Sequence, residues 1–261
     1  MEIPIFILTG LMAGFIGGLL GLGGGILLMP VLRFAFDMPV MEAVGITILS
    51  VFFVTISGSY YHYKLGHINF PSLVPVIIAG AFSSFLFSFI FNKMMGHTQW
   101  IDCAIGLVFL IVSARMIRAG LRKRMGRDAF SRFNNRLPGT IFQKGLTGVF
   151  AGAMPGLLGI GTGAILVPIF TFTLKASIKV AIGSSLACFT INALVSAVMK
   201  WHQGLIDLST ALPIGLGAVL GAIIGSTVNN RIPSSALKFI FGIIFLYVSS
   251  KFILSPWGIT I

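Results

Sequence analysis

The sequence predicts an all-α polytopic membrane protein of about eight transmembrane helices, built from two homologous four-span repeats. Three observations predict this fold: few charged residues, long uncharged runs, and a match between the two halves of the chain. The 261 residues include 18 basic and 6 acidic ones, so 9% are charged and 56% are hydrophobic. A soluble domain carries about 25% charged residues. The composition therefore excludes an ordinary water-soluble enzyme and a disordered chain, and it disfavours nucleic acid as a partner.

Uncharged runs mark the spans, because about 20 apolar residues cross the hydrocarbon core as a helix. Such runs cover residues 3–32, 43–61, 68–92, 145–174, 180–199, 208–230 and 239–250. A further run, 101–117, is interrupted only by Arg115, whose long side chain can reach the membrane interface. We therefore expect eight spans.

The first span of each repeat leaves an alternative open. Residues 3–36 are more than one crossing requires, so residues 3–20 and 25–36 can instead form a hairpin of two short helices. Five segments per repeat would make the two repeats inverted, whereas four make them parallel. We prefer the parallel form, because the inverted form places Lys200 and Lys251 outside the cell.

Half of the basic charge lies in one loop. Nine of the 18 basic residues fall between Arg115 and Lys144, against a single acid, Asp128. The positive-inside rule places this loop in the cytoplasm, and eight spans then place both termini there. We expect a multi-pass protein of the cytoplasmic (inner) membrane with repeats at 1–117 and 145–261. The loop at 118–144 would touch anionic lipid headgroups.

The two halves of the chain match without a gap when they are shifted by 138 positions. Over residues 10–34 the match is 12 of 25. The glycines at 10, 14, 18, 21, 23 and 25 fall on those at 148, 152, 156, 159, 161 and 163, and Pro30 falls on Pro168. The same register still pairs residues 92–93 with 230–231. The sequence therefore predicts a duplicated unit.

Glycines are densest at residues 18–25 and 156–163. Each glycine costs about 1 kcal/mol relative to alanine inside a helix, so we expect the helix to break there. Unwound backbone at membrane depth is tolerated only where it is buried in protein or lines a cavity, and in transporters broken helices face anionic substrates. We therefore predict an anion site between the two repeats. Its members are Gly23, Gly24, Gly25, Gly161, Thr162 and Gly163.

Close helix packing through small residues is the alternative role of these glycines. We favour packing for Gly10, Gly14 and Gly18, which are spaced by four along one face. The consecutive glycines at 23–25 do not have this spacing, so there we favour the break and the site.

Hydroxyl and amide side chains in the second span of each repeat can donate hydrogen bonds to an oxyanion. The main candidates are Thr47, Ser184, Ser185 and Asn192. Helix-to-helix hydrogen bonds, or hydroxyls bonded to their own backbone, are the alternative. Asn192 is the most costly of these groups to leave unpaired.

The remaining polar residues exclude several classes of function. All six acids lie at predicted span ends or in loops, which disfavours a cation carrier. The sequence contains no recognisable nucleophile–base pair, metal cluster or phosphate-binding loop, so we expect no enzyme activity, no metal and no cofactor. The four histidines fall in predicted turns. Lys200 and Trp201 fit anchoring at the interface, with substrate gathering as the alternative for Lys64 and Lys200.

The paired motifs resemble those of the sulfite exporter TauE/SafE family of membrane permeases. Gly-Leu-Leu-Gly-Leu-Gly-Gly-Gly and Gly-Leu-Leu-Gly-Ile-Gly-Thr-Gly are each followed by a proline after four residues. Each is then followed by Ala-(Val/Ile)-Gly-x-(Thr/Ser), at residues 43–47 and 181–185. The resemblance implies a permease that moves small sulfur-containing anions, such as sulfite or organosulfonates, across the cytoplasmic membrane.

The membrane potential favours export of such an anion, because a negative interior drives it outward at about 2.3 kcal/mol per charge per 100 mV. We therefore expect an exporter that works by alternating access. A non-transporting membrane scaffold, whose glycines only pack helices, is the alternative. The sequence leaves open which anion is moved, any coupling ion, and whether the protein forms a homo-oligomer.

Overall fold

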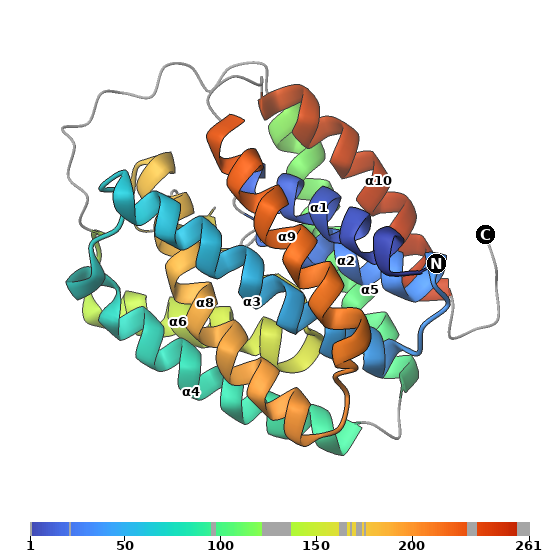
Figure 1. Ribbon diagram of the computed structural model, residues 1–261. Coiled ribbons are helices and arrows are strands. Elements are labelled where there is room, and N and C mark those ends of the chain that lie inside the picture. Colours follow the sequence, from blue (N-terminus) through green and yellow to red (C-terminus); the bar gives the residue numbers. More distant parts are fainter. Residues whose placement is uncertain are drawn as a thin grey trace. The chain divides into compact units, whose positions relative to one another are not determined.

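The computed structural model describes residues 2–20, 22–94, 98–121, 137–161, 166–167, 169–170, 174, 176–228 and 234–254. Its regular elements, within these residues, are all helices (Figure 1). The first repeat contains α1 (Glu2–Leu20), α2 (Gly25–Pro30), the π-helix η1 (Val31–Ala35), α3 (Val40–Lys64), α4 (Phe70–Met94) and α5 (Thr98–Leu121). The second contains α6 (Ile141–Leu158), α8 (Ile178–His202), α9 (Leu208–Val228) and α10 (Ser234–Leu254).

The predicted class, an all-helical polytopic membrane protein, is confirmed. Four helices, α3, α4, α8 and α9, are long and apolar enough to cross a membrane, and shorter apolar helices accompany them. The number of crossings stays a prediction. The loop expected at 118–144 is shortened by helix at both ends, because α5 continues to Leu121 and α6 begins at Ile141. Most of its basic residues lie outside the described residues.

The chain divides into two compact units that do not coincide with the two repeats. One unit is Met1–Lys93 with Phe133–Asn230, and the other is Met94–Arg132 with Arg231–Ile261. Each unit therefore combines corresponding parts of both repeats. The first unit holds both glycine motifs, and the second holds α5 and α10.

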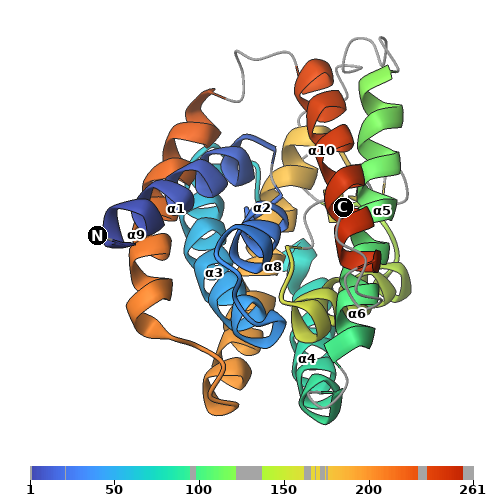
Figure 2. The same ribbon diagram turned by 90° about the vertical axis from the view of Figure 1, so that its right-hand side faces the viewer.

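In the first unit, α1 packs against α9 and α6 packs against α4, so the first helix of each repeat contacts a helix of the other repeat. In α1, Gly10, Gly14 and Gly18 touch the backbone of Ile214, Ala218 and Ala222 in α9 (Figure 2). In α6, Gly148, Gly152 and Gly156 touch Val76, Gly80 and Ser84 in α4. The two sets are related by the same shift of 138 residues. The duplication therefore holds for the contacts, and the packing role predicted for the glycines of α1 is confirmed.

Corresponding helices of the two repeats run in opposite directions. In the first unit, Gly45 near the start of α3 touches Leu205 just after α8, whereas Gly183 near the start of α8 touches His62 near the end of α3. In the second unit, the Cβ position of Gly106 lies 2.7 Å from Ile253, which pairs the first half of α5 with the end of α10. Both pairs are antiparallel, so the repeats are inverted. The preference for parallel repeats is wrong.

The reversal takes place at the first glycine motif. Helix α1 ends at Leu20. The Cβ position of Gly24 lies only 2.9 Å from the carbonyl oxygen of Ala13, which is almost two turns before that end. Gly23 and Gly24 have φ angles of 78° and 75°, a left-handed conformation that favours glycine. The motif therefore breaks the helix as predicted, and residues 3–36 form the hairpin that the sequence left as the alternative. The preference for parallel repeats assumed that Lys200 is a charge exposed at the membrane surface, but Lys200 is buried.

Replacing Gly152 by alanine tests the close packing of α6 against α4. The added methyl group would collide with the backbone of Gly80 and lie 2.7 Å from the amide nitrogen of Ser84. We expect a loss of about 1–3 kcal/mol of stability, as overpacking in a core costs, and a lower unfolding temperature in detergent, followed by tryptophan fluorescence.

Gly145→Ala in the same helix is the matched control, because no described atom beyond its chain neighbours and its own helix backbone lies within 4 Å of its Cβ position. This variant should unfold at the wild-type temperature or above it, since alanine favours a helix over glycine. Equal unfolding temperatures for the two variants would contradict the close contact of α6 with α4.

Candidate functional site

The two glycine motifs meet inside the first unit. The Cβ position of Gly25 lies 2.9 Å from the amide nitrogen of Gly161, and that of Gly161 lies 2.5 Å from the carbonyl oxygen of Leu22. We call this contact between residues 22–25 and Gly161 the glycine crossing. Side chains at either glycine would push the two backbones apart. The sequence therefore requires glycine here so that the two repeats can approach closely.

Helices α3 and α8 supply the walls of the glycine crossing. The Cβ position of Gly25 lies 2.7 Å from a methyl of Val51 and 3.3 Å from the methyl of Thr47, both in α3. From α8, the ring of Phe189 lies 2.8 Å from the Cβ position of Gly23. These neighbours are fully or almost fully buried. Among the described residues, the crossing is thus a buried place where backbone groups are the main polar groups.

Of the predicted hydroxyl residues, Thr47 lies at the crossing. Its methyl faces Gly25, and its hydroxyl donates a long hydrogen bond of 3.9 Å to the sulfur of Met29. Such a bond is weak, since a thioether is a poor acceptor. The Thr47 hydroxyl can therefore turn to a better acceptor at small cost.

Ser185 is the counterpart of Thr47 in the second repeat. It lies one turn before Phe189 on the same side of α8, and its buried hydroxyl has no hydrogen-bond partner within the described residues. Ser184 has an equally unpaired hydroxyl. Ser184 lies between Ala181 and Cys188 on the side of α8 that packs with Leu73 of α4. The helical spacing therefore places Ser185 on the face of α8 that carries Phe189, and Ser184 on a different face.

Asn192 lies apart from the crossing. Its amide packs on Gly80 of α4, whose Cβ position is 2.7 Å from Oδ1. Both of its polar side-chain atoms are buried without a partner in the part of the chain that is described. Thr162 and Gly163, the other predicted members of the site, lie outside the described residues.

Phe189 and Leu22 are members of the crossing that sequence reasoning missed. Phe189 follows Ser185 by four residues, so the helical spacing placed it on the same face. However, a phenylalanine in an apolar span does not by itself indicate a functional site. Leu22 contributes a carbonyl oxygen, which no residue type reveals.

Lys200 is not an interfacial anchor. Its side chain is fully buried, whereas Trp201 beside it is 51% exposed. The ammonium donates a hydrogen bond of 3.1 Å to the carbonyl oxygen of Gly156 and lies 3.1 Å from the centre of the Phe91 ring. The anchoring prediction fails for Lys200 because the end of α6 leaves carbonyl groups that require donors.

Two of the histidines form a buried pair instead of lying in open turns. His62 is inside α3, and its Nδ1 is 3.1 Å from Nδ1 of His67 in the following loop. Burial, with the charge of Lys179, lowers the pKa of His67. Two neutral rings fit this contact, because one nitrogen donates and the other accepts.

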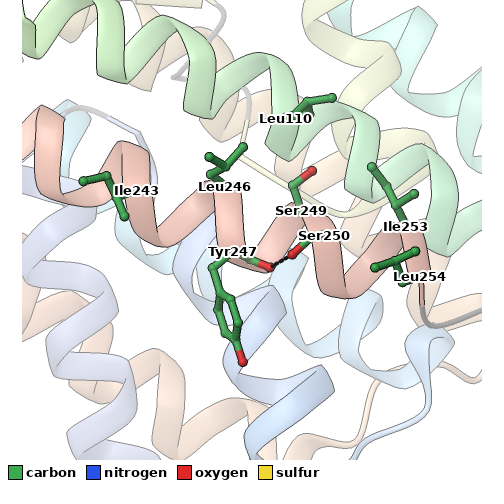
Figure 3. Close-up of a pocket in the computed structure, with 8 residues that line it drawn as sticks. All are labelled: Leu110, Ile243, Leu246, Tyr247, Ser249, Ser250, Ile253 and Leu254. Carbon is green, nitrogen blue, oxygen red and sulfur yellow. Dashed lines mark hydrogen bonds between the residues drawn. The ribbon is translucent and has the colours of Figure 1, made fainter. Parts of the chain in front are cut away.

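The second unit has an apolar groove on α10 and α5. Leu110, Ile243, Leu246, Tyr247, Ser249, Ser250, Ile253 and Leu254 line it (Figure 3). Its serine hydroxyls are already used, since Ser249 donates to the carbonyl of Gly106 and Ser250 to that of Tyr247. Because no lining residue is charged, the groove does not suit an anion and fits a surface that faces lipid.

Comparison with known proteins places the chain among membrane transporters. The profile of the family described as sulfite exporter TauE/SafE matches residues 6–252. A probable membrane transporter protein of Methanocaldococcus jannaschii is 27% identical over 91% of this chain and 90% of its own length. Another of Bacillus subtilis is 25% identical over 97% and 98%, and one of Xylella fastidiosa is 26% identical over 99% and 98%. No solved structure matches the chain.

A double-mutant cycle tests the glycine crossing. Gly25→Ala and Gly161→Ala each push on the other motif, so their effects on stability should not add. We expect a coupling of about 0.5–3 kcal/mol in the unfolding free energy, as for residues in contact. Gly25→Ala combined with Gly145→Ala should be additive within about 0.5 kcal/mol, because those sites share no neighbour. Additivity in both pairs would contradict the crossing.

Proposed function

The chain belongs to the sulfite exporter TauE/SafE family, and we propose that it exports small sulfur-containing anions such as sulfite or organosulfonates. Family and relatives indicate a membrane transporter rather than an enzyme. The proposal rests on one observation above all: the two glycine-broken segments, one from each repeat, touch at Gly25 and Gly161. Transporters bind substrates where broken helices of inverted repeats meet.

The glycine crossing offers an anion what it needs. Neither Gly24, which precedes α2, nor Gly161 has a side chain, so an anion can reach the backbone N–H groups directly. Thr47 and Ser185 add hydroxyl groups on opposite walls. Hydrogen bonds from such groups are strong in a dry site, since the local dielectric constant is low. A small oxyanion matches these donors and requires less separation of the two backbones than a large organic ligand does.

Inverted repeats provide the conformational change. Two similar units of opposite direction can exchange their conformations, so that the site opens first to one side of the membrane and then to the other. The glycine contacts of α1 with α9 and of α6 with α4 let backbones slide without side chains that interlock. We propose alternating access around the glycine crossing.

The orientation follows from inverted repeats combined with the basic loop. With the loop in the cytoplasm and five crossings on either side of it, both termini lie on the outer face, which replaces the cytoplasmic termini expected for eight spans. This arrangement also moves Lys175, Lys179 and Arg231 to the cytoplasmic side, where basic residues are favoured. The loop there lies against anionic headgroups, each basic residue adding about 1 kcal/mol.

An epitope tag before Met1 tests this orientation. Protease added to intact spheroplasts should remove the tag, because the N-terminus would lie outside. A tag inserted in the basic loop should survive until the membrane is opened. A protected N-terminal tag would contradict the five-crossing arrangement.

Anion flux under an imposed potential tests the function. Each charge gains about 2.3 kcal/mol per 100 mV. A potential of about 100 mV therefore changes the equilibrium concentration ratio of a doubly charged anion across the membrane by about three powers of ten. Proteoliposomes loaded with sulfite should therefore release it faster with a negative interior than with a positive one. Equal release at both polarities, or no release above that of empty liposomes, would contradict the proposal. The second result would favour the scaffold.

A further inference from the structure

One face of α8 carries a buried line of polar residues. Asn192, Ser196 and Lys200 recur every four residues, and Gln203 follows after three, so all four share one side of the helix. We call them the α8 polar stripe. Their first three members are fully buried. The stripe begins one turn after Phe189, which touches the glycine crossing, and Lys200 lies about 16 Å farther along the helix axis than Phe189.

The polar stripe faces α4 and α6. The backbone carbonyl of Asn192 accepts a hydrogen bond of 2.9 Å from the Ser84 hydroxyl. The Ser196 hydroxyl donates one of 2.7 Å to the backbone carbonyl of Pro155. Beyond Lys200, the amide of Gln203 donates to the carbonyl of Ser88 at 2.9 Å. Three helices thus surround a continuous polar strip within the first unit.

The first repeat provides an internal control. The positions of α3 that correspond to the stripe hold Val54, Gly58, His62 and Leu65. Helix α3 occupies the corresponding place in the inverted fold with only one polar side chain on this face. Packing of the shared fold therefore does not require the polar stripe, and its polarity calls for another reason.

Lys200 is the member that packing explains least. A buried charge is costly unless it is paired, and polar groups inside membrane spans mark substrate pathways. Among the described residues, no carboxylate pairs with Lys200. The ammonium has three donors, and the carbonyl of Gly156 uses one of them, while the Phe91 ring covers another side. Its remaining hydrogen-bonding capacity suits an anion.

Asn192 and Gln203 point to the same kind of ligand. Both amide atoms of Asn192 and Oε1 of Gln203 are buried without partners in the described part of the chain. An unmade hydrogen bond costs about 1–3 kcal/mol, so such groups are kept only where something else satisfies them. The Nδ2 group of Asn192 can donate to an oxyanion that passes between the glycine crossing and Lys200.

We propose that the α8 polar stripe is the anion's path between the glycine crossing and the end of α8, and that the Lys200 ammonium is the fixed positive charge that binds a small sulfur oxyanion on this path. The inference rests on the proposed function. It assigns the polar side chains of α8 to one half of the transport route. Stabilisation of the α6 end by Lys200 is a separate structural role, and the experiment distinguishes the two.

Sulfite release from proteoliposomes, measured over a range of internal concentrations, tests this path in the full-length protein. Lys200→Met removes the charge and keeps the length of the side chain, so we expect its KM to rise about tenfold or more, as loss of a charged hydrogen bond predicts. Lys200→Arg keeps the charge and should stay closer to the wild-type KM than Lys200→Met. Lys93→Met is the matched control, because Lys93 is exposed beside Phe89, and its KM should not change.

The unfolding temperature of each variant shows whether it folds and its flux can be interpreted. A wild-type KM in Lys200→Met, whatever its unfolding temperature, would overturn the path and leave only the structural role. If Lys200→Met does not fold, Asn192→Val decides, since valine is the residue that the first repeat has at this position. Flux of the folded Asn192→Val protein should fall, and wild-type flux would overturn the path. Wild-type protein that moves no sulfite would instead contradict the proposed function itself.

Discussion

Close contact between backbones, made possible by glycine, is the constraint on which this structure depends. In α1 and α6 a glycine at every fourth position lets a helix of one repeat touch the backbone of a helix from the other. In lipid, where apolar side chains gain nothing from leaving water, such contacts supply the van der Waals energy that holds helices together. The same residue type then breaks the helix at Gly23 and Gly24 and lets the two motifs touch. Packing and the candidate site therefore share one physical cause.

Inverted repeats explain how such a structure can serve transport, and the differences between the repeats explain where polarity is found. The contacts of α1 with α9 repeat those of α6 with α4 at the same register. The side chains do not follow this symmetry: α8 carries Asn192, Ser196 and Lys200 where α3 carries Val54, Gly58 and His62. A symmetric backbone gives two conformations of similar energy. Asymmetric side chains then give the two halves of the route different chemistry.

Composition and periodicity predicted the helical class, the duplication and the helix break, because these depend on local residue choice. The direction of the repeats could not be predicted in the same way. A run of 3–36 fits one long span or a hairpin, and only the contact of Gly24 with Ala13 decides between them. The burial of Lys200 depends on the end of α6, which is distant in sequence. Thr47 lies beside Gly25. Asn192 lies against α4, because its position on the helix face is set by packing partners that the sequence does not reveal.

A structure of the protein with bound selenite, the heavier analogue of sulfite, would show whether the anion binds at the glycine crossing. Selenium is located by its anomalous scattering, so the position of the anion is measured without assumption. We expect an anion within hydrogen-bonding distance of backbone amides at Gly24, Gly25 or Gly161, with the hydroxyl of Thr47 or Ser185 turned toward it. An anion bound only outside the first unit, with the two glycine motifs still in contact, would rule out the glycine crossing as the binding site.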